Sequence, residues 1–197
     1  MGQAAVNRLD QLVQIVDTAM AEAARKSGRW LACRPGCYHC CIGPFPITQL
    51  DALRLRHGLA ELKARDPAKA ALLLESAVAS VERIRRDFPD DPLGGVLATE
   101  NAPDEEPCPA LDRDTGTCDL YAARPITCRI FGPAVRFGAN SVATCELCYT
   151  GATDEEIAAC EVEVDPDDLE SQLLEELAES KGVSGETIVA FALTAAS

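Results

Sequence analysis

The segment Cys33–Thr48, CRPGCYHCCIGPFPIT, places four cysteines within nine residues, two of them adjacent. Pro35-Gly36 and Gly43-Pro44 make this segment a loop, because proline and glycine interrupt regular secondary structure. So dense a group of thiols indicates a disulfide network, a redox pair, a nucleophile or a metal site. The rest of the sequence has to discriminate between these four.

The composition is that of a globular protein: 197 residues, 47% hydrophobic and 25% charged. This length predicts a single domain over 1–197. A chain of this size buries enough surface to fold without covalent cross-links. Its ten cysteines are therefore not needed as structural staples.

The N-terminal segment lacks the apolar core of a secretory signal and carries charges at Arg8, Asp10 and Asp17. No apolar stretch is long enough to span a bilayer. We therefore expect a cytoplasmic protein, where clustered cysteines favour metal or redox chemistry over disulfides. An oxidised, disulfide-bonded protein is the alternative.

The formal net charge of −14 and the absence of a basic stripe predict no nucleic-acid partner and no membrane partner. Residues 154–180 contain no Lys or Arg. We interpret this acidic C-terminal region, 151–197, as solvated helix surface. The alternative is a docking surface for a basic protein partner.

Hydrophobic periodicity predicts a mainly α fold, with helices from both termini packed around an irregular, metal-organised cysteine-rich centre that has at most a short hairpin. Thr48 with Asp51, and Asp66 before Pro67, are typical helix starts. A turn at Thr115-Gly116 favours the hairpin. The predicted segments are an N-terminal segment 4–32 with its helix at 4–27, a core 33–150 with helices at 49–64 and 67–88 and a loop at 89–107, an ambiguous stretch 154–164, and helices at 166–182 and 184–193.

The N-terminal helix is expected to bury one apolar face, formed by Val6, Leu9, Val13, Val16 and Met20, which recur at helical spacing. The centre has no such periodicity. Something other than apolar packing should organise it.

The cysteines fall into three groups and one single residue, Cys160. Two residues between cysteines let both sulfurs turn toward one ion, as in zinc ribbons and Fe–S loops. The spacing therefore predicts a thiolate metal site in the centre. The candidate ligands are Cys33, Cys37, Cys40, Cys41, Cys108, Cys118, Cys128, Cys145 and Cys148.

The adjacent pair Cys40-Cys41 has side chains that diverge in both strand and helix geometry. One thiol then ligates while the other packs, or each serves a different metal, or the two form a vicinal disulfide. His39 lies inside the cluster but competes with four thiols for the ion. Cys160, beside alanines, is expected to be a small buried hydrophobe.

Two segments together resemble a known family: CRPGCYHCCIGPFPIT and PCPALDRDTGTCDLYAARPITCRIFG, the latter at 107–132. They are similar to the YkgJ-type cysteine-cluster family, which carries a zinc- or iron-chelating CxxCxxCC domain. The spacing departs once, because Cys33 stands four residues before Cys37 where the family box expects three. The matching residues are Cys37, Cys40 and Cys41 for the box, Cys108-Pro109 for its later Cys-Pro, and Cys118, Tyr121, Arg124, Pro125, Cys128 and Arg129 for the final run.

The resemblance implies a metal-chelating domain that often contains an Fe–S cluster. Flagellin lysine methylases carry a related cysteine box, so a protein-modifying enzyme is an alternative. No glycine-rich loop for a methyl donor follows a strand here.

We expect the cofactor to be an Fe–S cluster, in the 4Fe–4S form, or zinc, since thiolates suit both. One structural zinc closes with four ligands and would leave many thiols unexplained. Nine cysteines suffice for one or two centres. The expected function is electron transfer or metal handling, and the alternative is a zinc-stabilised interaction module.

Arg124 and Arg129 flank Cys128, and each has two interpretations. Each forms ion pairs or hydrogen bonds within the fold, or offsets the negative charge of clustered thiolates. Tyr121 is expected to pack, and Trp30 and Phe45 to shield the site.

Overall fold

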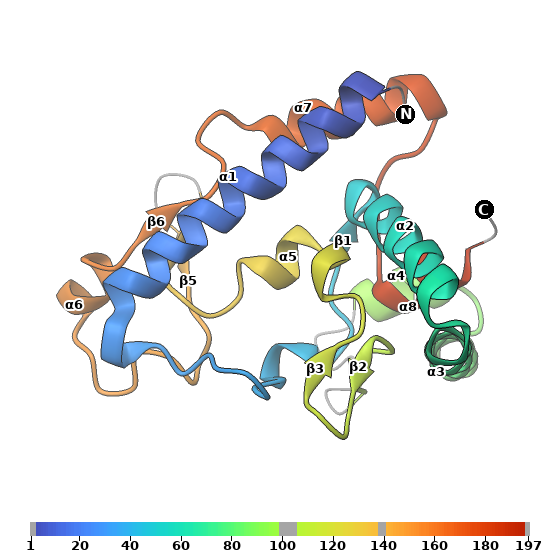
Figure 1. Cartoon of the computed structure of the whole chain (residues 1–197), viewed down its shortest axis with the longest axis horizontal. Helices are drawn as coiled ribbons and strands as arrows, with labels where there is room; N and C mark the ends of the chain where they lie inside the picture. Colours follow the sequence, from blue (N-terminus) through green and yellow to red (C-terminus); the bar gives the residue numbers. More distant parts are fainter. Residues whose placement is uncertain (1–2, 99–105, 138–140, 196–197) are drawn as a thin grey trace. The chain divides into compact units, whose positions relative to one another are not determined.

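The computed structural model describes residues 3–98, 106–137 and 141–195. The fold is mainly helical, as predicted, and the described strands are two or three residues long. Contacts divide the chain into two compact units. Figure 1 shows the chain coloured by residue number from the N-terminus to the C-terminus. Unit 1 comprises Met1–Arg34 and Ile126–Ser184, and unit 2 comprises Pro35–Pro125 and Gly185–Ser197. That these units form the single domain expected over 1–197 stays a prediction.

Unit 1 is built on the long helix α1 (Gln3–Ser27), which packs along α7 (Leu169–Lys181) as Figure 1 shows. The helix was expected at 4–27, so its prediction is confirmed. The other elements of unit 1 are η1 (Gly28–Trp30), α5 (Ile126–Arg129), β4 (Val135–Phe137), β5 (Ser141–Ala143), α6 (Asp154–Ala158) and β6 (Val162–Glu163).

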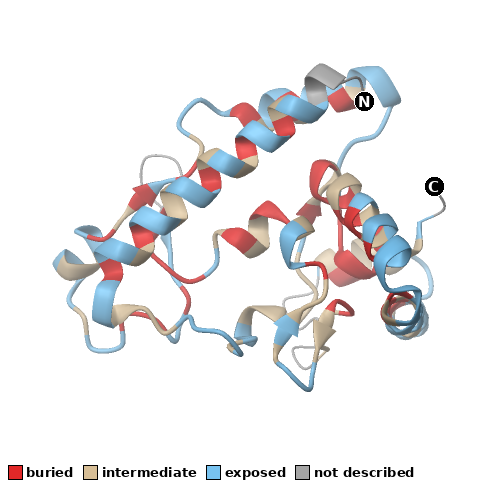
Figure 2. Ribbon diagram, in the orientation of Figure 1, coloured by how far each residue is buried: buried red, intermediate tan, exposed pale blue. Residues whose placement is uncertain are grey.

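The buried face of α1 is not quite the predicted one. Leu12 is fully buried although it was not assigned to the apolar face, whereas Val6 is 38% exposed. Figure 2 shows the buried positions along one side of the helix. The other members of the buried stripe are Leu9, Val16 and Ala23.

A small three-stranded sheet in unit 1 has the order β5-β4-β6, with β4 antiparallel to β5 and parallel to β6. The expectation of at most a short hairpin was therefore wrong, because segment 135–163 also pairs. The short strand suspected in 154–164 is β6, and α6 precedes it with a capping box between Thr153 and Glu156.

Unit 2 packs α2 (Gln49–Arg65), α3 (Pro67–Asp87) and α8 (Val189–Thr194) against one another. The starts of the first two helices are as predicted: Thr48 accepts a hydrogen bond from the Asp51 N–H, and Asp66 from the Lys69 N–H. The other elements of unit 2 are η2 (His39–Cys41), β1 (Ile47–Thr48), α4 (Pro92–Ala98), β2 (Leu111–Asp112), β3 (Thr117–Cys118), η3 (Tyr121–Ala123) and β7 (Glu186–Thr187).

Three boundaries differ from the sequence prediction. The loop expected at 89–107 contains α4, which begins at Pro92 after the Asp91 side chain accepts the Gly94 N–H. Helix α7 begins at Leu169 rather than 166, because Asp165 accepts from the N–H groups of Leu169 and Glu170. The helix expected at 184–193 begins only at Val189, because Glu186 and Thr187 pair with β1.

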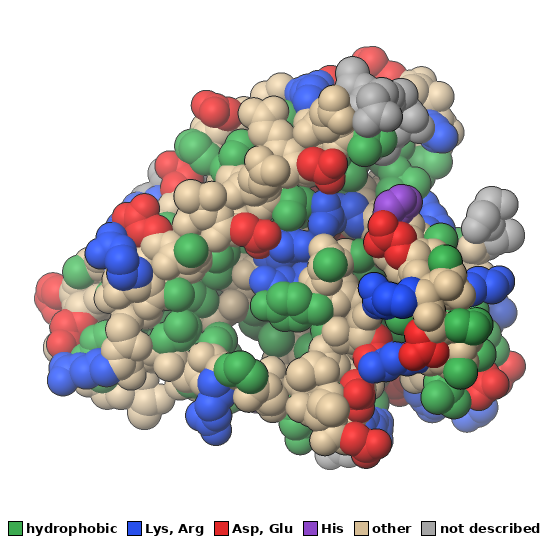
Figure 3. Space-filling view, in the orientation of Figure 1, with side chains coloured by type: hydrophobic (Ala, Val, Ile, Leu, Met, Phe, Trp, Pro, Cys, Tyr) green, Lys and Arg blue, Asp and Glu red, His purple; other side chains and the backbone are tan. Residues whose placement is uncertain are grey.

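Within the described ranges, no helix is both long and apolar enough to cross a membrane. The surface in Figure 3 shows acidic and basic side chains interspersed with small hydrophobic groups.

Candidate metal centre

All ten cysteines lie in the described part of the chain, and none of them is joined in a disulfide. Each of the two units contains five of these cysteines. Unit 2 holds Cys37, Cys40, Cys41, Cys108 and Cys118, and unit 1 holds Cys33, Cys128, Cys145, Cys148 and Cys160.

In unit 2, a backbone ladder joins the first cysteine loop to the later Cys-Pro segment. The Cys108 N–H donates to the Cys41 carbonyl at 2.7 Å, and the Gly43 N–H donates to the Glu106 carbonyl at 2.7 Å. These bonds flank a bridge between Ile42 and Pro107. Cysteines far apart in sequence are thereby held side by side.

The predicted hairpin at Thr115-Gly116 is formed by β2 and β3, with Leu111 opposite Cys118. Its tip touches the loop that carries Cys37: a Cβ on Gly116 would lie 2.8 Å from the Gly36 carbonyl oxygen, so only glycine fits. The hairpin therefore carries Cys118 in its second strand, and its turn contacts the loop that carries Cys37.

The vicinal pair Cys40-Cys41 interacts as donor and acceptor. The hydrogen bond from Cys41, helped by Arg124 and His39, lowers the pKa of Cys40 to about 6. The same bond and burial raise the pKa of Cys41. Both cysteines are free, and their hydrogen bond favours the thiolate of Cys40 over that of Cys41.

Cys108 and Cys118 are half-buried. Burial raises the pKa of Cys108 to about 12 and also raises the pKa of Cys118. Both residues pack against the main apolar core of this unit, as Phe45 does, which agrees with the shielding role expected for Phe45. Negative charge on Cys40 raises both pKa values further, and that of Cys41 responds to Cys108 and Cys118. The four sulfurs are thus electrostatic neighbours.

The two flanking arginines have different roles. Arg124 stacks 3.9 Å over the ring of Tyr121 and contributes to the lowered pKa of Cys40. Arg129 is buried and donates to both carboxylate oxygens of Asp17 at 2.7 and 2.8 Å. Arg124 therefore fits the charge-offsetting interpretation and Arg129 the structural one.

In unit 1, hydrogen bonds join the 30–33 segment to the 145–149 turn. The Tyr149 N–H donates to the Trp30 carbonyl at 2.9 Å, and the Ala32 N–H donates to Cys148 Sγ at 3.5 Å. The Cys148 N–H closes the turn on the Cys145 carbonyl at 2.9 Å. Trp30 packs over this cluster, as expected of a shielding residue.

Cys160 is buried, and its thiol donates to the Lys26 carbonyl at 3.4 Å. This confirms its expected role as a small buried residue. His39 and His57 are exposed, and His57 lies 3.7 Å from Glu61.

Sequence reasoning missed Gly132 and Tyr149. A Cβ on Gly132, whose φ is +117°, would lie 2.6 Å from Cys33 Sγ. Tyr149 has a φ of +57°, and its buried hydroxyl contacts Ser27 Oγ at 2.5 Å and accepts the Ala134 N–H at 3.0 Å. A non-glycine residue with positive φ marks a locally constrained site, which no sequence pattern signals.

Over residues 3–98, 106–137 and 141–195, no three cysteine, histidine or acidic side chains already converge as a metal coordination shell. The donor chemistry nevertheless fits zinc or iron, because both prefer thiolates. A metal that binds has to draw the neighbouring sulfurs inward, and the segments that carry them are short turns rather than long helices.

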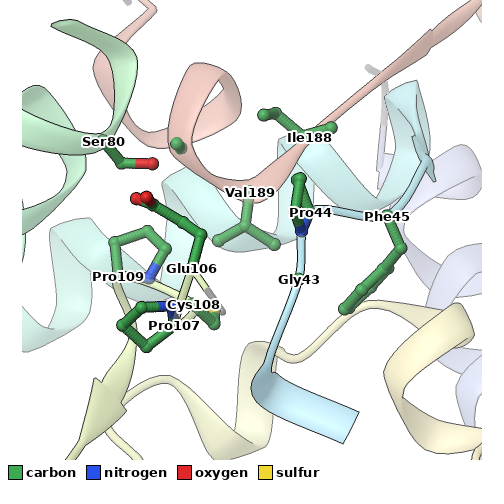
Figure 4. Close-up of a pocket in the computed structure, with 11 residues that line it drawn as sticks. Gly43, Pro44, Phe45, Ser80, Glu106, Pro107, Cys108, Pro109, Ile188 and Val189 are labelled. Atoms are coloured by element: carbon green, nitrogen blue, oxygen red, sulfur yellow. The ribbon is translucent and has the colours of Figure 1, made fainter. Parts of the chain in front are cut away.

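A shallow pocket in unit 2 borders Cys108 (Figure 4). In this pocket the Glu106 carboxylate accepts from Arg83 Nε at 2.9 Å and from the buried Ser80 hydroxyl. Its walls are apolar and include Pro44, Phe45, Pro107, Pro109, Ile188 and Val189.

Clustered, largely half-buried thiols held by short turns define a cysteine-rich metal-chelating protein. A family model described as "Putative zinc- or iron-chelating domain", CxxCxxCC, matches residues 32–161, which is more than half of the chain. The chain belongs to this family, as its cysteine pattern predicted, and the match supports metal binding by the chain. Searches of curated proteins and of solved structures found no match.

Proposed function

We propose that the protein holds an Fe–S cluster or zinc in unit 2, through Cys40, Cys41, Cys108 and Cys118, and that it serves electron transfer or metal handling in the cytoplasm. The observation that carries the proposal is the mutual electrostatic influence of these four thiols across the 41–43 and 106–108 ladder. Cys37, which follows Gly36 on the loop that the hairpin touches, is a further candidate donor.

An iron–sulfur cluster at this place would supply one-electron chemistry, whereas zinc would supply a structural link. The chain's own residues prepare the site for either. Arg124 offsets the charge of Cys40, and partial burial raises the pKa values of Cys108 and Cys118. The hydrogen bond between Cys40 and Cys41 keeps one sulfur ready to ligate.

The test is purification of the full chain without oxygen, followed by measurement of iron, zinc and acid-labile sulfide and a visible spectrum. Matched iron and sulfide with visible absorption supports a cluster, and stoichiometric zinc in a colourless protein supports a structural site. Cys118→Ser should lower the metal content, whereas Cys160→Ser, which removes a buried thiol elsewhere, should leave it unchanged. Unaltered metal content in Cys118→Ser would remove Cys118 from the site.

A second candidate function is a zinc-stabilised interaction module that binds a basic protein. Helix α7 supports it, because Glu175 and Glu179 are exposed on a helix whose only basic residue is the terminal Lys181. Arg8 pairs with Glu176 and offsets part of this charge. Salt-sensitive capture of a basic protein by the wild-type chain, lost in a Glu175→Gln/Glu179→Gln variant, would favour this function.

The pocket beside Cys108 supports a third candidate, a protein-modifying enzyme related to flagellin lysine methylases. Such an enzyme needs a place for substrate next to its reactive group, and Figure 4 shows the carboxylate of Glu106 facing Ser80 there. A flavin or methyl donor that co-purifies with the chain, identified by mass spectrometry, would favour this candidate over electron transfer.

A further inference from the structure

We infer that helix α3, which contains no cysteine, holds the segments of Cys108 and Cys118 in place before any metal binds, with Lys69 and Arg83 as the positioning residues. The inference rests on the proposed function, because these two thiols belong to the proposed unit 2 site. It adds residues outside the cysteine motif that keep the thiols together. Such pre-organisation, in which rigid neighbours fix a site in advance of its ligand, strengthens binding.

The first observation is the contact between α3 and the segment that carries Cys108. Arg83 donates to the carboxylate of Glu106 from Nε, at 2.9 Å, and from Nη2, so the pair is bidentate. The buried hydroxyl of Ser80, one turn earlier on α3, donates to the same carboxylate, and Figure 4 shows the two groups facing each other. The Glu106 side chain is 12% exposed. Because Glu106 is two residues before Cys108, this contact fixes the start of the cysteine segment.

The second observation is the contact between α3 and the β2–β3 hairpin, which carries Cys118. Lys69 Nζ lies 2.6 Å from a carboxylate oxygen of Asp119 and 3.7 Å from one of Asp112. Asp119 directly follows Cys118, and Asp112 lies in the opposite strand. The Asp119 side chain is 13% exposed, so water competes less for it than for an ordinary surface ion pair. One ammonium group therefore joins both arms of the hairpin to α3.

The third observation is the spacing of the two cations along α3. They lie about four helical turns apart and within about 40° of each other around the helix axis. The apolar face of α3, which includes Ala70, Leu73 and Ala77, belongs to the buried core against which Cys108 and Cys118 pack. The helix thus contacts both cysteines through its core and binds the residues beside them through its cations. A single helix therefore sets the separation of the two segments.

Both contacts extend to the first cysteine loop. The Glu106 carbonyl accepts from the Gly43 N–H at 2.7 Å, directly after the Cys40-Cys41 pair and Ile42. The hairpin turn at Gly116 meets the same loop at its other end, near Gly36. The loop is therefore held by the two segments that α3 holds.

The charges of these contacts also suit clustered thiolates. The carboxylates of Glu106 and Asp119 stand within two residues of cysteines that are expected to ligate as anions. Negative groups this close repel each other, and more strongly where water is partly excluded. The two cations of α3 offset these carboxylates, so the positioning contacts do not add to the negative charge of the site.

The test uses the reduced, metal-free full chain and measures how fast each cysteine reacts with N-ethylmaleimide, as read by mass spectrometry. In the wild type, Cys108 and Cys118 should react more slowly than the exposed Cys33. Lys69→Gln should speed the reaction of Cys118 about tenfold and leave that of Cys108 nearly unchanged, because it releases one segment to open locally. Arg83→Gln should give the reverse pattern.

Two control variants test this interpretation. Arg85→Gln removes an exposed cation from the same helix and should change neither rate. Lys69→Arg keeps a positive charge beside the hairpin and should retain the slow reaction of Cys118. Circular dichroism should give the wild-type helix content for every variant. Equal acceleration of the cysteines of both units would show a general loss of stability and overturn the inference.

Zinc binding gives a second readout. Lys69→Gln and Arg83→Gln should each bind Zn²⁺ about tenfold more weakly than the wild type with unchanged stoichiometry, since both keep every thiol but lose a contact that positions one. Competition with a chromogenic chelator measures the affinity. An equal loss of affinity in Arg85→Gln would assign the effect to the overall charge of the helix and overturn the inference.

The outcomes separate this inference from the proposed function. Selective acceleration in the metal-free variants, with a wild type that binds neither zinc nor iron, would uphold the role of α3 and overturn the proposed function. Unchanged reaction rates in Lys69→Gln and Arg83→Gln would overturn the inference. Loss of metal in Cys118→Ser would still support the proposed function in that case.

Discussion

Arg124 and Arg129 are five residues apart in one sequence motif, yet they have separate physical roles. One stacks on Tyr121 and acts on the charge of Cys40, and the other is buried in an ion pair with Asp17. The motif could not assign these roles, because the partner of Arg129 lies far away in the sequence. The sequence predicted that each arginine would take part in charged interactions, but it did not identify the partner of either arginine.

Arg129→Gln should therefore destabilise the fold. Loss of the charged hydrogen bonds to Asp17 is expected to lower the free energy of unfolding by about 1–3 kcal/mol. This free energy of unfolding is measured by urea unfolding of the metal-stripped chain, followed by circular dichroism. Arg124→Gln is the matched control and should leave that stability nearly unchanged; an equal loss in both variants would contradict the assignment.

Glu106 should make the stability depend on acidity. Burial tends to raise the pKa of Glu106, but hydrogen bonds from Arg83 and Ser80 outweigh it and hold the pKa below the ordinary value. Because the folded pKa is the lower one, this contribution is present above the ordinary glutamate pKa and is lost as the pH falls through the folded pKa.

The measurement compares the unfolding free energies of wild type and Glu106→Gln at neutral pH and at about pH 3. The difference should favour the wild type at neutral pH and shrink in acid. Ser80→Ala, which removes one of the two donors, should give a smaller difference of the same sign. A difference that stays constant with pH would show that the ion pair is not the cause.

At the scale of elements, the long helices were predictable because their periodicity and caps are local. Helices α1, α2 and α3 begin and end within about one residue of the predicted positions. Strands β1 and β7 were not predictable, since their pairing joins Ile47 to Thr187 and each strand has only two residues. That pairing also explains why the last helix begins later than expected.

The contact between α2 and η3 gives a prediction that contradicts helix propensity. A Cβ on Gly58 would lie 2.3 Å from the Cβ of Ala123. Gly58→Ala should therefore lower stability, although alanine is favoured over glycine inside a helix by about 1 kcal/mol. The exposed Ala60→Gly in the same helix is the control and should lose about that amount. A gain of stability in Gly58→Ala would mean that the Ala123 segment moves away from the added methyl group at little cost. The stability of both variants is measured by thermal unfolding.

At the scale of the whole molecule, the cysteine pattern predicted the kind of site but not its division. The candidate ligands fall into two units, and the boundary passes between Arg34 and Pro35, inside the first cysteine loop. No spacing rule reveals such a boundary, because it depends on which later segments each half of the loop contacts. The family match supports metal binding and includes the cysteines of both units.

Metal removal should weaken the whole fold. The cysteine segments are short turns whose local packing is supplemented by the bound ion, so a ligand that binds only the folded state stabilises it. Chelator treatment should lower the denaturation midpoint, and added Zn²⁺ under reducing conditions should restore it. The Cys118→Ser/Cys148→Ser double variant should respond to neither treatment; a full response in that variant would place the metal elsewhere.

The chain's path between its units has a consequence for biosynthesis. The polypeptide enters unit 2 at Pro35, leaves it at Ile126 and returns only at Gly185. Helix α8, which packs on both α2 and α3, therefore leaves the ribosome after every cysteine has been translated. Until then the nascent chain presents its thiols on an unfinished scaffold, exposed to oxidants and to competing ions. Loading of the unit 2 site is thus expected to follow the emergence of α8 from the ribosome.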